Sequence, residues 1–308
     1  MNGIKHSVAQ WWSGCLAAWD EFWFASTQPY TLALIRICCG AMLVYVHIIW
    51  AVLIGDFFGP TAWVQRSVVA QLHQSDWVWS WLFYTDSSLI LWVHQIVAIL
   101  ASLAMMLGLF TRWTIPLAWW LTLMVCHRMT GALFGLDQIV VMLSMYLMFS
   151  HCGSVWSLDA WLAGQNDKKL AHVSNNVATR LIQLHLCVIY LFGGLSKMRG
   201  AQWFEGSALW WTAVNYEYQS LDITWLANFP WLIAALTAAT IFWETFYVAL
   251  VWPKQTRPIA LGMAVMVHGG IAVALGMVTF GTIMIVANLA FVSPEIVRRA
   301  IKRRPEVD

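Results

Sequence analysis

Residues 88–110 read SLILWVHQIVAILASLAMMLGLF, a run that contains no Asp, Glu, Lys or Arg. The stretch 229–252, FPWLIAALTAATIFWETFYVALVW, is nearly as apolar and carries a single charged residue, Glu244. The hydrocarbon core of a bilayer is about 30 Å thick and needs about 20 apolar residues per helix. Each of the two stretches therefore predicts a transmembrane α-helix.

The composition of the whole chain agrees with a membrane location. Of the 308 residues, 60% are hydrophobic and 10% are charged, against roughly 25% charged in soluble domains. A net charge of +2 gives no reason to expect a nucleic-acid partner, and the six cysteines show no disulfide-scaffold or metal-ligand spacing. We therefore expect an integral membrane protein without a metal site, and no linker-like segment divides the single domain, 1–308.

The fold class expected is all-α, a polytopic membrane helix bundle with about eight transmembrane helices. The bundle covers 30–292, and its spans are 30–54, 88–110, 115–134, 139–151, 178–196, 229–252, 258–276 and 277–292. Before it, at 7–26, Trp12, Leu16, Trp19 and Trp23 recur at helical spacing, which predicts an interfacial helix lying on the membrane surface. After it, 293–308 forms a basic cytoplasmic tail.

The distribution of Lys and Arg predicts the orientation, because cytoplasmic loops carry an excess of these residues. With about eight spans and both termini in the cytoplasm, twelve basic residues lie inside: Lys5, Arg112, Lys168, Lys169, Arg180, Lys254, Arg257, Arg298, Arg299, Lys302, Arg303 and Arg304. Only Arg66, Lys197 and Arg199 then lie outside. The bias predicts that Lys197 is near the outer face, in what we expect to be a bacterial inner membrane.

Several ionisable residues fall inside the apolar spans, where each costs at least ~2.5 kcal/mol to insert. For Arg36 and Glu244 we favour an interhelical ion pair over catalysis, and Asp137 is expected to pair with Arg128. Arg36, Glu244 and Arg128 are thus interpreted as structural charges. Haem ligation is a minor alternative, resting on His47, His94, His127, His185 and His268, which lack the paired spacing of stacked b-type haems.

Segment 190–206, YLFGGLSKMRGAQWFEG, ends an apolar stretch with two glycines and then places Lys197 at the membrane edge. Two interpretations remain open for this lysine. Its ammonium group reaches the interface by snorkelling, or it is shielded from water and acts as a general base.

At this segment the sequence resembles the HTTM (horizontally transferred transmembrane) family and the related membrane domain of vitamin K-dependent gamma-glutamyl carboxylases. The family's Tyr-x-x-Gly-x-x-Lys helix end and Trp-x-x-Gly are matched by Tyr190, Gly193 or Gly194, Lys197, Trp203 and Gly206. Further matches follow in the family's order: WDEFWF at 19–24, LIRI at 34–37 with Gly40, FFGP at 57–60, WSLD at 156–159, FWETF at 242–246, His268, LGM at 275–277, Phe280, Met284 and SPE at 293–295.

The resemblance implies a chemistry in which a lysine base activates a reduced quinone for reaction with O2, after which CO2 adds to a substrate carbanion at the outer face. Carried over by position, Lys197 is the base and His268 its partner. Tyr190, Gly194 and Trp203 fall at substrate- or quinone-binding positions. Asp137 stands near where the carboxylases have an outer histidine.

The implied cofactor is reduced vitamin K or another lipid quinol, with O2 and CO2 as co-substrates. The expected partners are the lipid bilayer, the lipid quinone, and a peptide, small-molecule substrate or partner protein. Carboxylases that act on proteins carry a large luminal domain after the last helix, where this chain has the basic stretch 298–308. The alternative is therefore a non-catalytic membrane binding protein, of peptide-maturation or immunity type, on the same scaffold.

Overall fold

The computed structural model describes residues 2–74, 77–164 and 170–302. These segments are helical and contain no strand; the only extended pairing among them is an isolated bridge between Thr27 and His172. The all-α expectation is confirmed.

Five helices are long and apolar enough to cross a membrane, and the protein is an integral membrane protein. They are α2 (Tyr30–Val52), α5 (Ser88–Leu107), α9 (Val173–Lys197), α12 (Pro230–Leu250) and α13 (Arg257–Ala274). Their lengths lie within the range that spans a bilayer.

The count of eight spans is not confirmed, because the helices at the other three expected positions are shorter or less apolar. α6 (Thr111–Arg128) contains three tryptophans and three threonines, which lower its hydropathy. α7 (Gly135–Leu147) has 13 residues and α14 (Val278–Asn288) has 11. The helix through α14 bends by 118° into α15 (Pro294–Lys302), and this bent pair counts as a sixth candidate span.

Shorter elements occupy the connections between the long helices. The helical ones are α3 (Ile54–Phe58), α4 (Arg66–Leu72), α8 (Leu158–Leu162), α10 (Ala201–Phe204) and α11 (Ala208–Ala213). The 3-10 turns are Trp81–Tyr84, Thr130–Ala132, Cys152–Ser154, Thr224–Asn228 and Leu289–Phe291.

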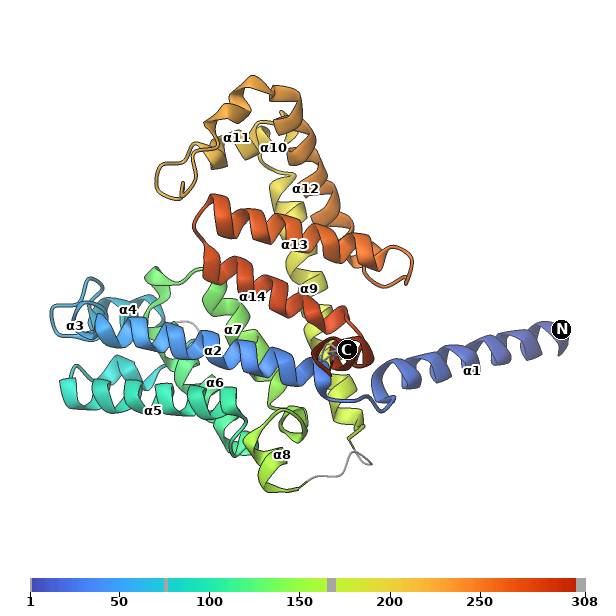
Figure 1. Ribbon diagram of the computed structural model, residues 1–308, viewed down its shortest axis with the longest axis horizontal. Helices are drawn as coiled ribbons and strands as arrows, with labels where there is room; N and C mark the ends of the chain where they lie inside the picture. The colour runs from blue at the N-terminus through green and yellow to red at the C-terminus, as the bar shows by residue number, and fades with distance from the viewer. Residues whose placement is uncertain (1, 75–76, 165–169, 303–308) are drawn as a thin grey trace, which may run out of the picture.

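α1 (Asn2–Phe24) projects away from the bundle (Figure 1). Its side chains from residue 10 onward are mostly exposed. Its last turn is anchored to the bundle, where Asn176 and Arg180 on α9 donate hydrogen bonds to the Phe22 carbonyl. A helix over the expected interfacial segment is confirmed, and its position in the membrane interface stays a prediction.

The most extensive helix contacts join α2 with α5, α9 with α12, and α13 with α14 (Figure 1). Glycines permit the closest approaches. A Cβ on Gly40 would lie 2.7 Å from the Met106 backbone nitrogen, and a Cβ on Gly194 would lie 2.7 Å from that of Thr245. Small residues at such points let membrane helices pack backbone to backbone.

The connections divide between two ends of the bundle (Figure 1). At one end the starts of α2 and α9 meet through the Thr27–His172 bridge, and Thr31 donates a hydrogen bond to the Val292 carbonyl after α14. Three contacts join the loops at the other end: Arg128 with the Val64 carbonyl, Gly135 with Phe280, and Ser220 with the Val273 carbonyl. Consecutive long helices therefore run in alternating directions.

Two expected ion pairs are not formed. Arg36 donates to the Trp156 carbonyl at 2.6 Å, and its Nε and Nη1 atoms have no hydrogen-bond partner. Arg128 donates to the Val64 carbonyl at 3.0 Å, whereas Asp137 accepts from the Phe134 amide at 3.1 Å. The two arginines thus bond to backbone carbonyls of neighbouring loops, and Asp137 bonds to a backbone amide at the start of its own helix. We had expected a residue of opposite charge as the partner in each case.

Candidate functional site

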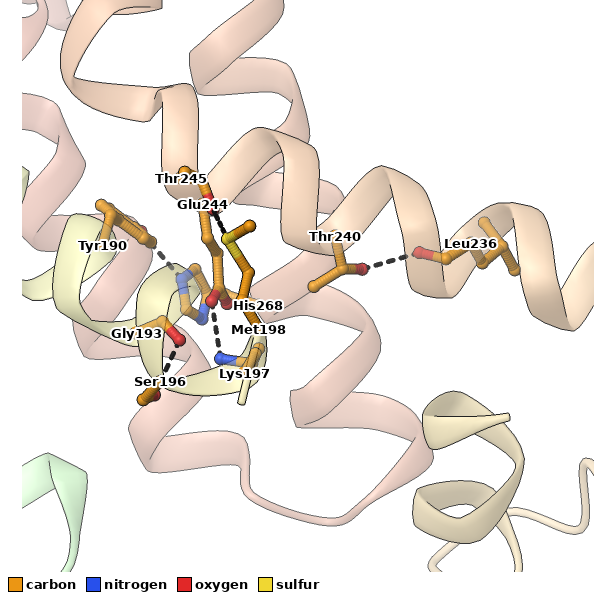
Figure 2. A network of polar contacts seen from close by, with 10 residues as sticks. All are labelled: Tyr190, Gly193, Ser196, Lys197, Met198, Leu236, Thr240, Glu244, Thr245 and His268. Atoms are coloured by element: carbon orange, nitrogen blue, oxygen red, sulfur yellow. Dashed lines mark hydrogen bonds and ion pairs between the residues drawn. The ribbon is translucent and has the colours of Figure 1, made fainter. Parts of the chain in front are cut away.

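Lys197, the last residue of α9, forms an ion pair with Glu244 in the middle of α12. The Lys197 Nζ atom lies 2.6 Å from Glu244 Oε2 (Figure 2). The two side chains are 27% and 11% exposed, so both charges are largely withdrawn from the surface. The contact corrects the expectation that Glu244 pairs with Arg36, because α12 packs on α9, and Arg36 lies on α2 against the Trp156 loop.

A glycine lies on one side of this ion pair, and an aromatic ring lies on another. A Cβ on Gly193 would lie 3.3 Å from Glu244 Oε2 and 3.8 Å from Lys197 Nζ. On another side the ammonium lies 5.4 Å from the ring centroid of Trp203, within the range of a cation–π interaction. The lysine head is therefore held between a carboxylate and an indole.

A second polar group lies on the same face of α9. Tyr190 is seven positions before Lys197, which is about two helical turns. Its hydroxyl lies 2.8 Å from Nε2 of His268 on α13 (Figure 2). Both side chains are buried.

Two residues that the sequence interpretation missed extend this group. Asn288 on α14 donates from Nδ2 to the Tyr190 hydroxyl at 2.8 Å. Tyr247 on α12 donates to Asn288 Oδ1 at 2.6 Å. Asn288 and Tyr247 are both buried, and their polar character inside apolar stretches is the signal that could have identified them.

Aromatic rings enclose the imidazole of His268. Ring centroids of Tyr190, Phe280 and Trp243 lie 5.9, 5.8 and 6.2 Å from that of His268. The Trp243 indole donates its own N–H to the Ala260 carbonyl, so its polar atom is satisfied away from the imidazole. The group therefore lies in an apolar, aromatic setting.

The ion pair and the Tyr190 group form one site. Both contacts, Lys197 with Glu244 and Tyr190 with His268, are made from one face of α9 (Figure 2). Gly194, one turn before Lys197, gives α12 its close approach. The structure thus brings together five residues chosen from the sequence: Lys197, His268, Tyr190, Gly194 and Trp203.

Asp137, Arg36 and Arg128 lie outside this group of contacts. Asp137 belongs to the first turn of α7, where its carboxylate caps the Phe134 amide. The nearest link to the site is indirect: a Cβ on Gly135 would meet the ring of Phe280, which packs on His268.

Among the described residues, no three His, Cys, Asp or Glu side chains are grouped as a metal site would require. The haem alternative meets a specific obstacle at His47. Its Nδ1 and Nε2 atoms lie 2.9 Å from Gln95 and 3.0 Å from Thr122, so both nitrogens already have protein partners. An axial ligand needs one ring nitrogen free for the iron.

These features define an integral membrane helix bundle with a lysine–glutamate pair and a buried tyrosine–histidine group where α9, α12 and α13 meet. A family model described as the HTTM domain matches residues 24–295. The chain belongs to the HTTM domain family, and the expected family is confirmed. Comparisons with curated proteins and with solved structures gave no match.

Proposed function

We propose that this protein is a quinol-dependent enzyme of the gamma-carboxylase type, with Lys197 as the base. The observation that carries the proposal is the ion pair of Lys197 with Glu244 beside a buried aromatic group. Ionisable residues within membrane-spanning helices that have a specific partner are candidates for functional sites. Membership of the HTTM domain family supports the same chemistry.

The residues at the site suit a quinol. Quinone rings are planar and apolar with two polar oxygens, and the rings of Tyr190, Trp243 and Phe280 offer stacking surfaces around His268. Within the described part of the chain, the buried Nδ1 atom of His268 has no hydrogen-bond partner, and it can bond a quinone oxygen.

Lys197 and Glu244 can handle the first proton together. A proton shift across the 2.6 Å contact turns the ion pair into a neutral amine and a carboxylic acid. The amine then takes the hydroxyl proton of the quinol and becomes an ammonium again, next to the anion that it has generated. The Trp203 ring stabilises this ammonium, and the apolar surroundings keep water from quenching reactive species.

A bound quinol supplies, by its oxidation with O2 to the quinone epoxide, the strong base that removes a proton from a substrate carbon before CO2 adds. Within this scheme reduced vitamin K or another lipid quinol is the cofactor. The acceptor is a peptide or small molecule at the outer face.

The membrane topology proposed for this enzyme has eight crossings, with α6, α7 and α14 as short spans beside the five long ones. Both termini lie in the cytoplasm of a bacterial inner membrane, and Lys197 lies near the outer face. The alternating helix directions and the clustering of Arg112, Arg180 and Arg257 at helix ends support this arrangement. Labelling of single cysteines introduced at Gln219 and Lys254 by a membrane-impermeant reagent tests it: only the cysteine at 219 should react in intact cells.

One observation favours the alternative of a non-catalytic binding protein. The Lys197–Glu244 contact joins α9 to α12, and an ion pair can serve only to hold two helices together. Under this alternative Lys197→Ala changes stability but leaves partner binding intact, and binding depends on the outer loops instead.

The deciding experiment incubates detergent-purified protein with vitamin K hydroquinone, O2, labelled bicarbonate and a short glutamyl peptide. Quinone epoxide and fixed label are followed together in wild type, Lys197→Ala and Arg199→Ala. Arg199 is an exposed cation two positions away and serves as the charge-matched control.

We expect both products in wild type and Arg199→Ala, and neither in Lys197→Ala. Epoxide without fixed label would mean a different acceptor. The absence of both products from folded wild-type protein would overturn the enzymatic proposal in favour of the binding protein.

A further inference from the structure

The Met284 carbonyl, which can only accept a hydrogen bond, fixes the orientation of the Asn288 side-chain amide. Asn288 Nδ2 donates to the Met284 carbonyl at 2.9 Å. A flipped amide would place its oxygen against that carbonyl oxygen, which is repulsive. The nitrogen therefore stays on this side, and its second hydrogen points to the Tyr190 hydroxyl.

This orientation fixes the direction of the next hydrogen bond. The Tyr190 hydroxyl accepts from Asn288, so it uses its own hydrogen to donate to Nε2 of His268 at 2.8 Å. An acceptor nitrogen carries no hydrogen. A protonated Nε2 would leave the Tyr190 hydrogen without an acceptor in a buried place.

Neutral His268 therefore carries its hydrogen on Nδ1. That atom is buried and has no hydrogen-bond partner among the residues that the structure describes. A buried donor left unpaired is unfavourable. Three consecutive hydrogen bonds, from Met284 through Asn288 and Tyr190 to His268, fix this donor in place, and such a donor is unusual unless some group accepts its hydrogen.

We propose that the Nδ1–H of His268 donates a hydrogen bond to an oxygen of the bound quinone, and that Asn288 and Tyr190 are positioning residues that fix the tautomer. The inference rests on the proposed function for the identity of the ligand. The tautomer itself follows from the protein's own hydrogen bonds. The rings of Phe280 and Trp243 beside the imidazole select a flat, apolar molecule around that oxygen.

The tautomer can be read directly by NMR. Protein labelled with 15N-histidine in detergent micelles gives long-range proton–nitrogen correlations that distinguish Nδ1–H from Nε2–H, and the His268 signals are assigned by their loss in His268→Gln. We expect Nδ1–H in wild type. In Tyr190→Phe the donor to Nε2 is gone, and the Nδ1–H signature should be lost or mixed with the other tautomer.

Ligand binding is measured with menadione, a tailless naphthoquinone, by quenching of tryptophan fluorescence. The matched probe is 2-methylnaphthalene, which has the same rings and no oxygen. His268→Gln keeps an acceptor for Tyr190 but places no donor at the position of Nδ1. Tyr146→Phe is the control variant, because it removes a phenol hydroxyl that contacts a different histidine, His185 on α9, outside the site.

We expect menadione to bind His268→Gln and Tyr190→Phe about tenfold or more weakly than wild type, and Tyr146→Phe within about twofold of wild type. Binding of 2-methylnaphthalene should be the same in all four proteins, which shows that the variants are folded. A loss of binding of both ligands would mean that the substitutions damage the fold around His268, and it would overturn the inference.

Two results would overturn the proposed hydrogen bond from His268 to the quinone but would not contradict the proposed function. They are an Nε2–H tautomer in wild type and equal menadione affinity in every variant. Failure of wild type to bind menadione would overturn the quinone assignment and the proposed function with it. Quinone binding without turnover in the carboxylation assay would instead separate the two, since the inference would stand and the enzymatic proposal would fall.

Discussion

Gly194 on α9 lies against the backbone of Thr245 on α12, so that a Cβ at position 194 would stand 2.7 Å from the Thr245 nitrogen. Thr245 follows Glu244 directly in the sequence. The close approach of α9 and α12 at Gly194 therefore brings Glu244 within reach of Lys197. A single small residue controls both the packing and the ion pair.

Gly194→Ala should separate these helices and lower the free energy of unfolding by about 1–3 kcal/mol, the usual cost of overpacking. Thermal unfolding in detergent measures the effect. The control is Gly262→Ala on α13, where nothing lies within 4 Å of the added Cβ. Because Ala is a better helix former than Gly, this control should be neutral or slightly stabilising, and equal effects at the two positions would contradict the packing argument.

The Lys197–Glu244 pair should show energetic coupling. In a double-mutant cycle of Lys197→Met and Glu244→Met, we expect a coupling of roughly 0.5–3 kcal/mol in the free energy of unfolding. The matched control is Arg66–Asp86, a 2.9 Å pair whose side chains are 40% and 32% exposed. Solvent screening should hold that coupling to about 0–1 kcal/mol, and a larger value there than at Lys197–Glu244 would refute the assignment of a shielded pair.

Arg36 and Glu244 should behave independently. Arg36 bonds the Trp156 carbonyl, and Glu244 bonds Lys197, with no shared partner. The effects of Arg36→Met and Glu244→Met on unfolding should therefore add to within about 0.5 kcal/mol. A coupling free energy above that limit in the double-mutant cycle would instead support the direct Arg36–Glu244 ion pair that the sequence predicted.

The outcome for these charges shows where sequence reasoning ends. Hydrophobic runs predicted the long helices, and the family resemblance singled out Tyr190 and Lys197 near the end of one of them. A single hydrophobic segment does not show which other helices it packs against. The partner of Glu244 was therefore predicted wrongly, and Asn288 and Tyr247 were missed because they reach the site from α14 and α12.

The short spans stay a prediction. Apolar content predicted a crossing at 277–292, and the helix through α14 ends at Phe291, where it bends by 118° into α15. The proline at 294 starts a new helix there, since proline fits the first turn of a helix and disrupts its interior. The described helix α14 keeps only 11 residues, although these still carry Asn288 into the site.

Asp137 offers a test of a structural role against a chemical one. Its carboxylate caps the start of α7 through the Phe134 amide, at 3.1 Å. Asn keeps an oxygen that can accept from this amide, whereas Ala does not, and loss of such a hydrogen bond costs about 0.5–1.5 kcal/mol. Asp137→Asn should therefore keep both the unfolding temperature and turnover in the epoxide assay, and Asp137→Ala should lower the unfolding temperature. If Asp137→Asn remains stable but loses turnover, the carboxylate takes part in the chemistry at the outer face, as the family resemblance implied.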